Sequence, residues 1–250
     1  MLKTRKVLAA ALTMSMFFTF ASCKKQENKQ EPITGTPISM YDYFALPDGE
    51  ELVLEGYVQD KESLWKNSEG LTTCSFYIQT DVGGAYIYEA SVTEDTYNAM
   101  TDGMLVRVQG IKSTWSDLPE ITKGIVEVVG GNPYSAPYYE ITSDEIPSAA
   151  LNTRVCVNDA VIGKLDSGNV LEYGYNNQGG RGDNLYFLVT INDGNKTVSI
   201  PCTVDTHLVS ASDEVYASVE NIVLGQTASV NGILSVRGSD YFILVTDITL

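Results

Sequence analysis

Short runs in which apolar and polar residues alternate recur along most of this chain. Leu52, Leu54 and Val58, for example, are separated by two or four residues, with Glu51, Glu55 and Tyr57 between or beside them. A period of two places such residues on one face of a half-buried β-strand. In the first half this pattern, interrupted by clusters of Gly, Asn, Asp and Ser, predicts strands over residues 52–58, 74–80, 85–89, 103–112 and 121–129.

One strand pattern occurs twice. Residues 103–112 read GMLVRVQGIK and residues 225–234 read GQTASVNGIL, so that a Gly-Ile pair closes both segments. A glycine inside a strand is typical of a bulge, a sharp bend or a close approach of another backbone. The repeat predicts that the same strand has been used in two separately folded halves.

The two halves also share an order of elements. In the first, Ser91 and Glu94 have the spacing of a capping box, and they predict a short helix that reaches Met100. In the second half we predict strands over 155–161, 185–191, 196–201, 225–234 and 241–250, and a helix around 213–222. Each half therefore reads strand, strand, strand, helix, strand, strand.

This order resembles that of the oligonucleotide/oligosaccharide-binding (OB) fold, a five-stranded Greek-key barrel with a helix between its third and fourth strands. The chain is similar in this respect to tandem OB-like lipoproteins of Bacteroidetes and related bacteria. The predicted fold is all-β, with two tandem five-stranded OB-like Greek-key barrels that each carry one short helix. The expected boundaries are 37–131 for the first domain, 132–137 for a linker and 138–250 for the second domain; a β-sandwich in the second half is the alternative.

The amino terminus has the three parts of a secretory signal. Residues 1–22 combine a basic start, an apolar run and small residues just before Cys23. Phe20 to Cys23 resembles the lipobox of bacterial lipoproteins, which implies lipidation of Cys23 and anchoring at the cell envelope, with Lys24 fitting transport to the outer membrane. The polar residues 23–36 predict a flexible tether. An ordinary signal peptide with a coincidental cysteine is the alternative.

Charge changes the range of expected partners. The chain has 16 basic and 32 acidic residues, and removal of Lys3, Arg5 and Lys6 with the signal leaves 13 basic residues and a net charge of −19. Because nucleic-acid binding draws much of its affinity from cations that neutralise phosphates, the sequence predicts no nucleic-acid partner.

The cysteines indicate neither a metal site nor a redox motif. Cys74, Cys156 and Cys202 stand apart, without a C-x-x-C pair among them. If Cys23 is lipidated, an odd number of thiols remains, and buried thiols inside strands are the expected arrangement. No cofactor and no metal are predicted.

An aromatic face is the candidate binding site. Because Phe76, Ile78 and Ile87 form the inward set of the second and third strands, the tyrosines between them share the opposite face. One tryptophan occurs in each flanking loop. The predicted ligand-binding residues are Trp65, Tyr77, Tyr86, Tyr88 and Trp115. The alternative is that these rings cover the barrel exterior or pack one domain on the other.

The sequence predicts no enzyme. His207 is the only histidine, with Asp205 two residues before it, and no nucleophile elbow, zinc-binding helix or phosphate-binding loop occurs. Residues 181–183 read RGD, the tripeptide that integrins bind, but a glycine-rich loop is the better interpretation. Residues 192–195 lack the further carboxylates of a calcium loop, so a hairpin turn is expected.

These features predict a lipid-anchored, extracytoplasmic binding or assembly module that holds carbohydrate or an envelope protein on the aromatic face of the first domain. A structural spacer of an envelope complex is one alternative. The other is a glycoside hydrolase, which needs two carboxylates facing each other across the domain junction.

Overall fold

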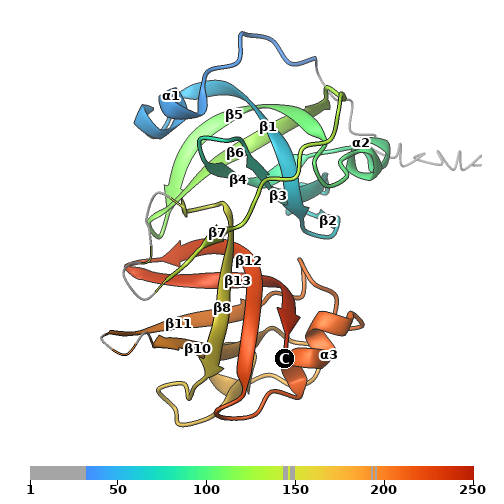
Figure 1. The fold of residues 1–250 in the computed structure, drawn as a ribbon. Coiled ribbons are helices and arrows are strands. Elements are labelled where there is room, and N and C mark those ends of the chain that lie inside the picture. Colours follow the sequence, from blue (N-terminus) through green and yellow to red (C-terminus); the bar gives the residue numbers. More distant parts are fainter. Residues whose placement is uncertain (1–31, 143–145, 147–149, 193, 195) are drawn as a thin grey trace, which may run out of the picture.

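The computed structural model describes residues 32–142, 146, 150–192, 194 and 196–250, which fold into two β-barrels (Figure 1). The predicted signal peptide, the lipidated Cys23 and most of the tether fall in residues 1–31, outside the described residues. The first sheet contains β1 (Glu51–Lys61), β2 (Trp65–Lys66), β3 (Thr72–Gln79), β4 (Gly84–Ser91), β5 (Leu105–Trp115) and β6 (Leu118–Val128). The second contains β7 (Tyr139–Glu140), β8 (Arg154–Ile162), β9 (Leu171–Tyr173), β10 (Leu185–Asn192), β11 (Thr197–Val204), β12 (Thr227–Arg237) and β13 (Asp240–Thr249).

Both sheets close on themselves in the same way. In the first, β1 pairs with β5 and with β3, and β4 lies parallel to β6, which gives the ring β1-β5-β6-β4-β3. In the second, β8 pairs with β12 and β10, and β11 lies parallel to β13. The helices α2 (Glu94–Ala99) and α3 (Glu214–Glu220) lie between the third and fourth strands of the two rings. This confirms the predicted fold class and rules out the β-sandwich alternative.

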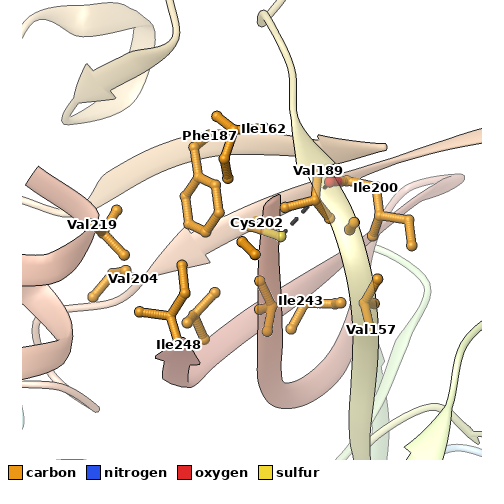
Figure 2. Close-up of a cluster of buried hydrophobic side chains, with 14 of the residues drawn as sticks. Val157, Ile162, Phe187, Val189, Ile200, Cys202, Val204, Val219, Ile243 and Ile248 are labelled. Atoms are coloured by element: carbon orange, nitrogen blue, oxygen red, sulfur yellow. Dashed lines mark hydrogen bonds between the residues drawn. The ribbon is translucent and has the colours of Figure 1, made fainter. Parts of the chain in front are cut away.

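Each barrel has its own apolar core. Phe76, Ile78 and Ile87 are fully buried in the first core, as the alternation predicts. In the second, Phe187 and Cys202 point inward among aliphatic side chains from neighbouring strands (Figure 2). The burial of large apolar side chains is the main free-energy gain that holds each barrel closed.

The repeated strand patterns are β5 and β12, and their shared glycines lie at irregularities of the strand pairing. The register shifts at Gly110, between Gln109 and Ile111, and again between Asn231 and Gly232. A Cβ at Gly232 would overlap the carbonyl oxygen of Leu244, and one at Gly110 would lie 2.6 Å from the Ile121 Cγ2 atom. The predicted bulge and close backbone approach are therefore confirmed at both positions.

Several local elements differ from the prediction. The helix α2 is capped by Thr93, whose hydroxyl accepts from the Thr96 N–H, rather than by Ser91. A further helix, α1 (Met40–Ala45), precedes the first barrel, with Ser39 and Asp42 forming its capping box. Between the predicted strands over 155–161 and 185–191, where the glycine-rich loop with the RGD tripeptide is expected, the structure contains β9 and the short 3₁₀ helix η2 (Tyr175–Asn177). Within the described residues, no helix combines the length and the apolar character required to cross a bilayer.

A buried arginine joins the two barrels. The Arg154 guanidinium, at the start of β8, donates to the Gln59 carbonyl oxygen (2.6 Å) and to the Asp102 carboxylate (2.7 Å), and it lies 3.8 Å from the Asp60 carboxylate. Its backbone N–H donates to the Gln79 side chain of the first barrel (2.9 Å). The first residue of the second barrel's ring is therefore fixed in the wall of the first barrel.

A glycine permits this close contact. At Gly84 a Cβ atom would overlap the backbone carbonyl of Asn152, and the Asn152 side chain in turn donates to the Pro119 carbonyl oxygen (3.0 Å). Only a residue without a side chain allows the two backbones to come so near. The interface also buries a small apolar cluster made of Tyr77, Tyr86, Leu118, Ile233 and Val236.

Candidate ligand-binding cleft

A cleft of about 630 Å³ opens between the two barrels. Its lining is rich in aromatic side chains and also carries carboxylates and one guanidinium. The first barrel contributes Glu62, Tyr77, Tyr86, Tyr88, Trp115, Leu118 and Glu120. The second contributes Tyr175, Asn184, Tyr186, Pro201, Thr203, Asp205, Ser235, Val236, Arg237, Asp240, Tyr241, Phe242 and Leu244.

Strand pairing aligns the tyrosines of the first barrel. Tyr77 and Tyr86 are opposite each other in the β3–β4 ladder, and their rings stack with centroids 4.7 Å apart. Tyr88 is two residues further along β4, on the same face, with its ring 6.2 Å from that of Tyr86. Tyr77 and Tyr86 are buried, whereas Tyr88 remains 38% exposed and lines the cleft.

The tips of the β5–β6 and β12–β13 hairpins form the wall of the cleft beside these tyrosines. The tight turn after Trp115 uses the positive φ angles of Ser116 and Asp117, and it leaves the Trp115 side chain 57% exposed. The Gly238 N–H, in the turn between β12 and β13, donates to the Ser116 carbonyl oxygen (2.7 Å). This contact brings Arg237 of the second barrel into the same cleft as Trp115.

The second barrel adds rings that the sequence did not identify. Tyr175 belongs to η2 and is 70% exposed, and Phe242 lies beneath the Arg237 guanidinium, 6.0 Å from its ring centroid. Because η2 follows β9 directly, the pairing of β9 with β10 holds this segment at the edge of the second sheet.

Carboxylates surround the tyrosine stack. The Tyr86 hydroxyl donates to the Glu62 carboxylate (3.1 Å), and Glu62 lies near Asp205 of the second barrel. Burial raises the pKa of Glu62, and the negative charge of Asp205 adds to this increase. Burial also raises the pKa of Tyr86, with the Glu62 carboxylate as the next cause. The phenol is therefore a neutral hydrogen-bond donor at any physiological pH.

Glu120 is the most buried of the acidic residues in the cleft. It is only 6% exposed, and it neighbours Tyr86 in the parallel β4–β6 pairing. Burial raises its pKa, and the carboxylates of Asp48 and Glu89 raise it further. Among the described residues, no basic side chain forms an ion pair with Glu120 and no donor is hydrogen-bonded to its carboxylate.

Four of the five predicted site residues line this cleft: Tyr77, Tyr86, Tyr88 and Trp115. Trp65 does not; it pairs with Thr73 in the short β2–β3 ladder. The expectation of an open aromatic face on the first barrel was wrong, because Tyr77 and Tyr86 are covered by the second barrel. No periodicity within one half of the sequence reports on docking between the halves. The acidic residues around Tyr86 and the aromatic residues of β13 were the features of the sequence that could have indicated a cleft between the barrels.

The other sequence features have structural roles. The exposed His207 ring is 3.0 Å from the Asp205 carboxylate, and the His207 carbonyl oxygen accepts from the Ser63 N–H across the interface (2.8 Å). Arg181 of the RGD tripeptide pairs with Glu220 on α3 (3.2 Å). Cys74 and Cys202 are buried, Cys156 is partly buried, and all three are free thiols. Across the described part of the chain, no three His, Cys, Asp or Glu side chains converge as metal ligands.

Comparison with known proteins gives structural likeness only. No family profile and no curated protein matches the sequence. A murine DNA-binding protein bound to double-stranded DNA matches with 10% identity and a TM-score of 0.36, covering 77% of this chain and 90% of that chain. A replication protein A heterotrimer bound to single-stranded DNA matches with 14% identity and a TM-score of 0.35, covering 79% and 49%. A deletion mutant of the single-stranded DNA-binding protein from Thermus aquaticus matches with 10% identity and a TM-score of 0.28, covering 81% and 94%.

The ligand class named for these structures differs from the expected one. They are described as DNA-binding proteins, and none of the three is described as a carbohydrate-binding or envelope protein. The expectations of a carbohydrate or envelope-protein ligand on the first barrel, of a spacer, and of a glycoside hydrolase are withdrawn. The exclusion of nucleic acid is withdrawn as well. At these identities and TM-scores, the likeness extends to the fold and not to a ligand.

Proposed function

We propose that this protein is a binding protein without enzymatic activity, and that it holds the planar ring of a nucleobase in the cleft between its two barrels. The observation that carries the proposal is the convergence of exposed aromatic side chains from both barrels, Tyr88, Trp115 and Tyr175, on one cleft. Such rings stack on the face of any base, and each stacked base contributes on the order of 1–3 kcal/mol.

The base can belong to a free nucleoside or to a single-stranded nucleic acid. Both present the same ring, but only the second brings a run of phosphates. Among the described residues, Arg237 is the one basic side chain that lines the cleft, and its exposed guanidinium is a suitable contact for a single phosphate. The test therefore measures binding of free nucleosides and of single-stranded nucleic acids separately.

The test uses the fluorescence of Trp115. A Trp65→Phe variant leaves Trp115 as the only tryptophan, and it is titrated with nucleosides and with short single-stranded oligonucleotides. We expect saturable binding that Tyr88→Ala and Tyr175→Ala each weaken about fivefold or more, because each loses one stacking surface. Tyr41→Ala is the matched control, since Tyr41 is an equally exposed ring outside the cleft.

Two outcomes would overturn the proposal. One is the absence of any saturable signal with either class of ligand. The other is equal affinity of the Tyr88→Ala, Tyr175→Ala and Tyr41→Ala proteins for the same ligand. Preference for oligonucleotides over nucleosides, or the reverse, identifies the source of the base.

We also propose that the protein is a bacterial lipoprotein anchored at the cell envelope through Cys23. The support is the sequence of residues 1–23, a basic start and an apolar run followed by Phe-Ala-Ser-Cys. Expression in a Gram-negative host with labelled palmitate tests it: the wild-type chain is expected to carry label and to fractionate with membranes. Unlabelled wild-type protein, or a labelled Cys23→Ser variant, would contradict this anchor.

A further inference from the structure

Among the described residues, the carboxylate of Glu120 lines the cleft without a partner. Glu120 is more than nine-tenths buried, lines the cleft, and neighbours Tyr86 in the strand pairing. Burial of most of this residue disfavours its charged form, which a hydrogen-bond donor on a ligand would stabilise. In the described part of the protein, neither a cation nor a hydrogen-bond donor meets it.

The surroundings of Glu120 are themselves acidic. The charges that act on it come from Asp48 and Glu89, and Glu62 faces the same Tyr86 ring from the end of β1. Tyr88 also experiences both Glu62 and Glu120. Tyr88, the exposed ring of this group, therefore lies near carboxylates, and a ligand stacked on it meets acceptors at its edge rather than donors.

From this placement we infer that Glu120 selects bases that carry an exocyclic amino group. This inference rests on the proposed function. An ionised carboxylate accepts from the amino group of cytosine, whereas uracil presents a carbonyl oxygen at the same position of its ring. That oxygen would face the Glu120 carboxylate without a shared proton, which leaves two acceptors unsatisfied. Glu120 is a specificity-determining residue in this arrangement.

Cytidine and uridine are the matched pair that tests the role of Glu120. Cytidine carries an amino group where uridine carries a carbonyl oxygen. At pH 8 we expect the Trp65→Phe protein to bind cytidine about fivefold to a hundredfold more tightly than uridine. Oligonucleotides of cytosine and of uracil provide the same comparison with phosphates present. This comparison changes only the ligand, so it requires no substitution at Glu120.

Replacement of Glu120 by an isosteric amide tests the residue itself. Glu120→Gln can donate to the uridine carbonyl oxygen, so the preference for cytidine is expected to disappear or reverse. Glu51→Gln, which removes an exposed carboxylate outside the cleft, is expected to keep the wild-type ratio. Thermal unfolding of both variants establishes that they remain folded.

The possible failures are distinguishable. Loss of all binding, by every nucleoside and oligonucleotide, refutes the proposed function. Binding of cytidine and uridine with equal affinity refutes only the role of Glu120. A preference for cytidine that survives in Glu120→Gln shows that another group reads the base, and it also refutes this inference.

Discussion

A single carboxylate shows how burial and pairing compete at the barrel junction. Asp60 lies next to the Arg154 guanidinium, which favours its charged form, yet burial is the larger influence. The pKa of Asp60 is raised from 3.8 to about 6, although Arg154 lowers it. The folded protein therefore holds a proton on Asp60 in a pH range where the unfolded chain has already released it.

This predicts a pH dependence of stability. Between about pH 4 and pH 6 the folded state binds more protons than the unfolded state, so the free energy of unfolding falls as pH rises. A shift of this size corresponds to at most about 3 kcal/mol. Asp60→Asn is expected to lose this component, as measured by urea unfolding at pH 4, 5, 6 and 7. Asp81→Asn, on an exposed turn, is the control; an unchanged slope in Asp60→Asn would refute the assignment.

At the scale of elements, the repeated strand accounts for why the sequence predicts the fold so well. Alternation fixed the inward residues of β3 and β4, and the glycines of β5 and β12 marked the places where each strand bends over its neighbour. Helices α1 and α2 both span six residues, too few to show a helical period, and α1 escaped prediction because its capping box ends in Asp42 rather than in the Glu that indicated α2. The segment β9 and η2 escaped because its glycines and asparagines read as a loop.

Gly232→Ala is predicted to destabilise the second barrel. The added methyl group would overlap the Leu244 backbone, which cannot move without breaking the β12–β13 ladder. Overpacking of this kind costs on the order of 1–3 kcal/mol. The measurement is denaturant unfolding of the variant beside Gly180→Ala, because a Cβ at Gly180 meets no atom within 4 Å.

Equal stability of the Gly232→Ala and Gly180→Ala proteins would contradict this prediction, because it would show that β13 can shift to accommodate the methyl group without loss of stability. Gly110→Ala provides the corresponding test in the first barrel, where the nearest atom belongs to the Ile121 side chain. The Thr122 carbonyl oxygen would also lie close, 2.8 Å from that Cβ, and we expect a smaller loss there because the Leu244 oxygen would lie closer still to a Cβ at Gly232.

At the scale of the whole molecule, the site could be predicted only in part. Period-two alternation correctly grouped Tyr77, Tyr86 and Tyr88 on one face, since that grouping depends only on the local pleat. Their partial burial depends on how the second barrel docks, and this is set by Arg154, Asn152 and the hairpin tips. Such contacts join residues far apart in the sequence, so no local pattern encodes them. The second barrel's share of the cleft was missed for the same reason.

The docking itself is testable through Gly84. In Gly84→Ala the new methyl group would overlap the Asn152 carbonyl, so we expect the barrels to separate while each retains its core. Calorimetry should then resolve two unfolding transitions where the wild type shows one, and small-angle scattering should report a larger radius of gyration. Gly180→Ala again serves as control. A single transition with an unchanged radius would mean that the junction absorbs the extra atom.

The cleft takes one wall from each half of the chain, and this has a consequence for any fragment of the protein. Each half contains a closed ring of strands but only one wall of the cleft. The proposed base binding thus requires the undivided polypeptide, and an endoprotease that severs the two halves and lets them part is expected to abolish it.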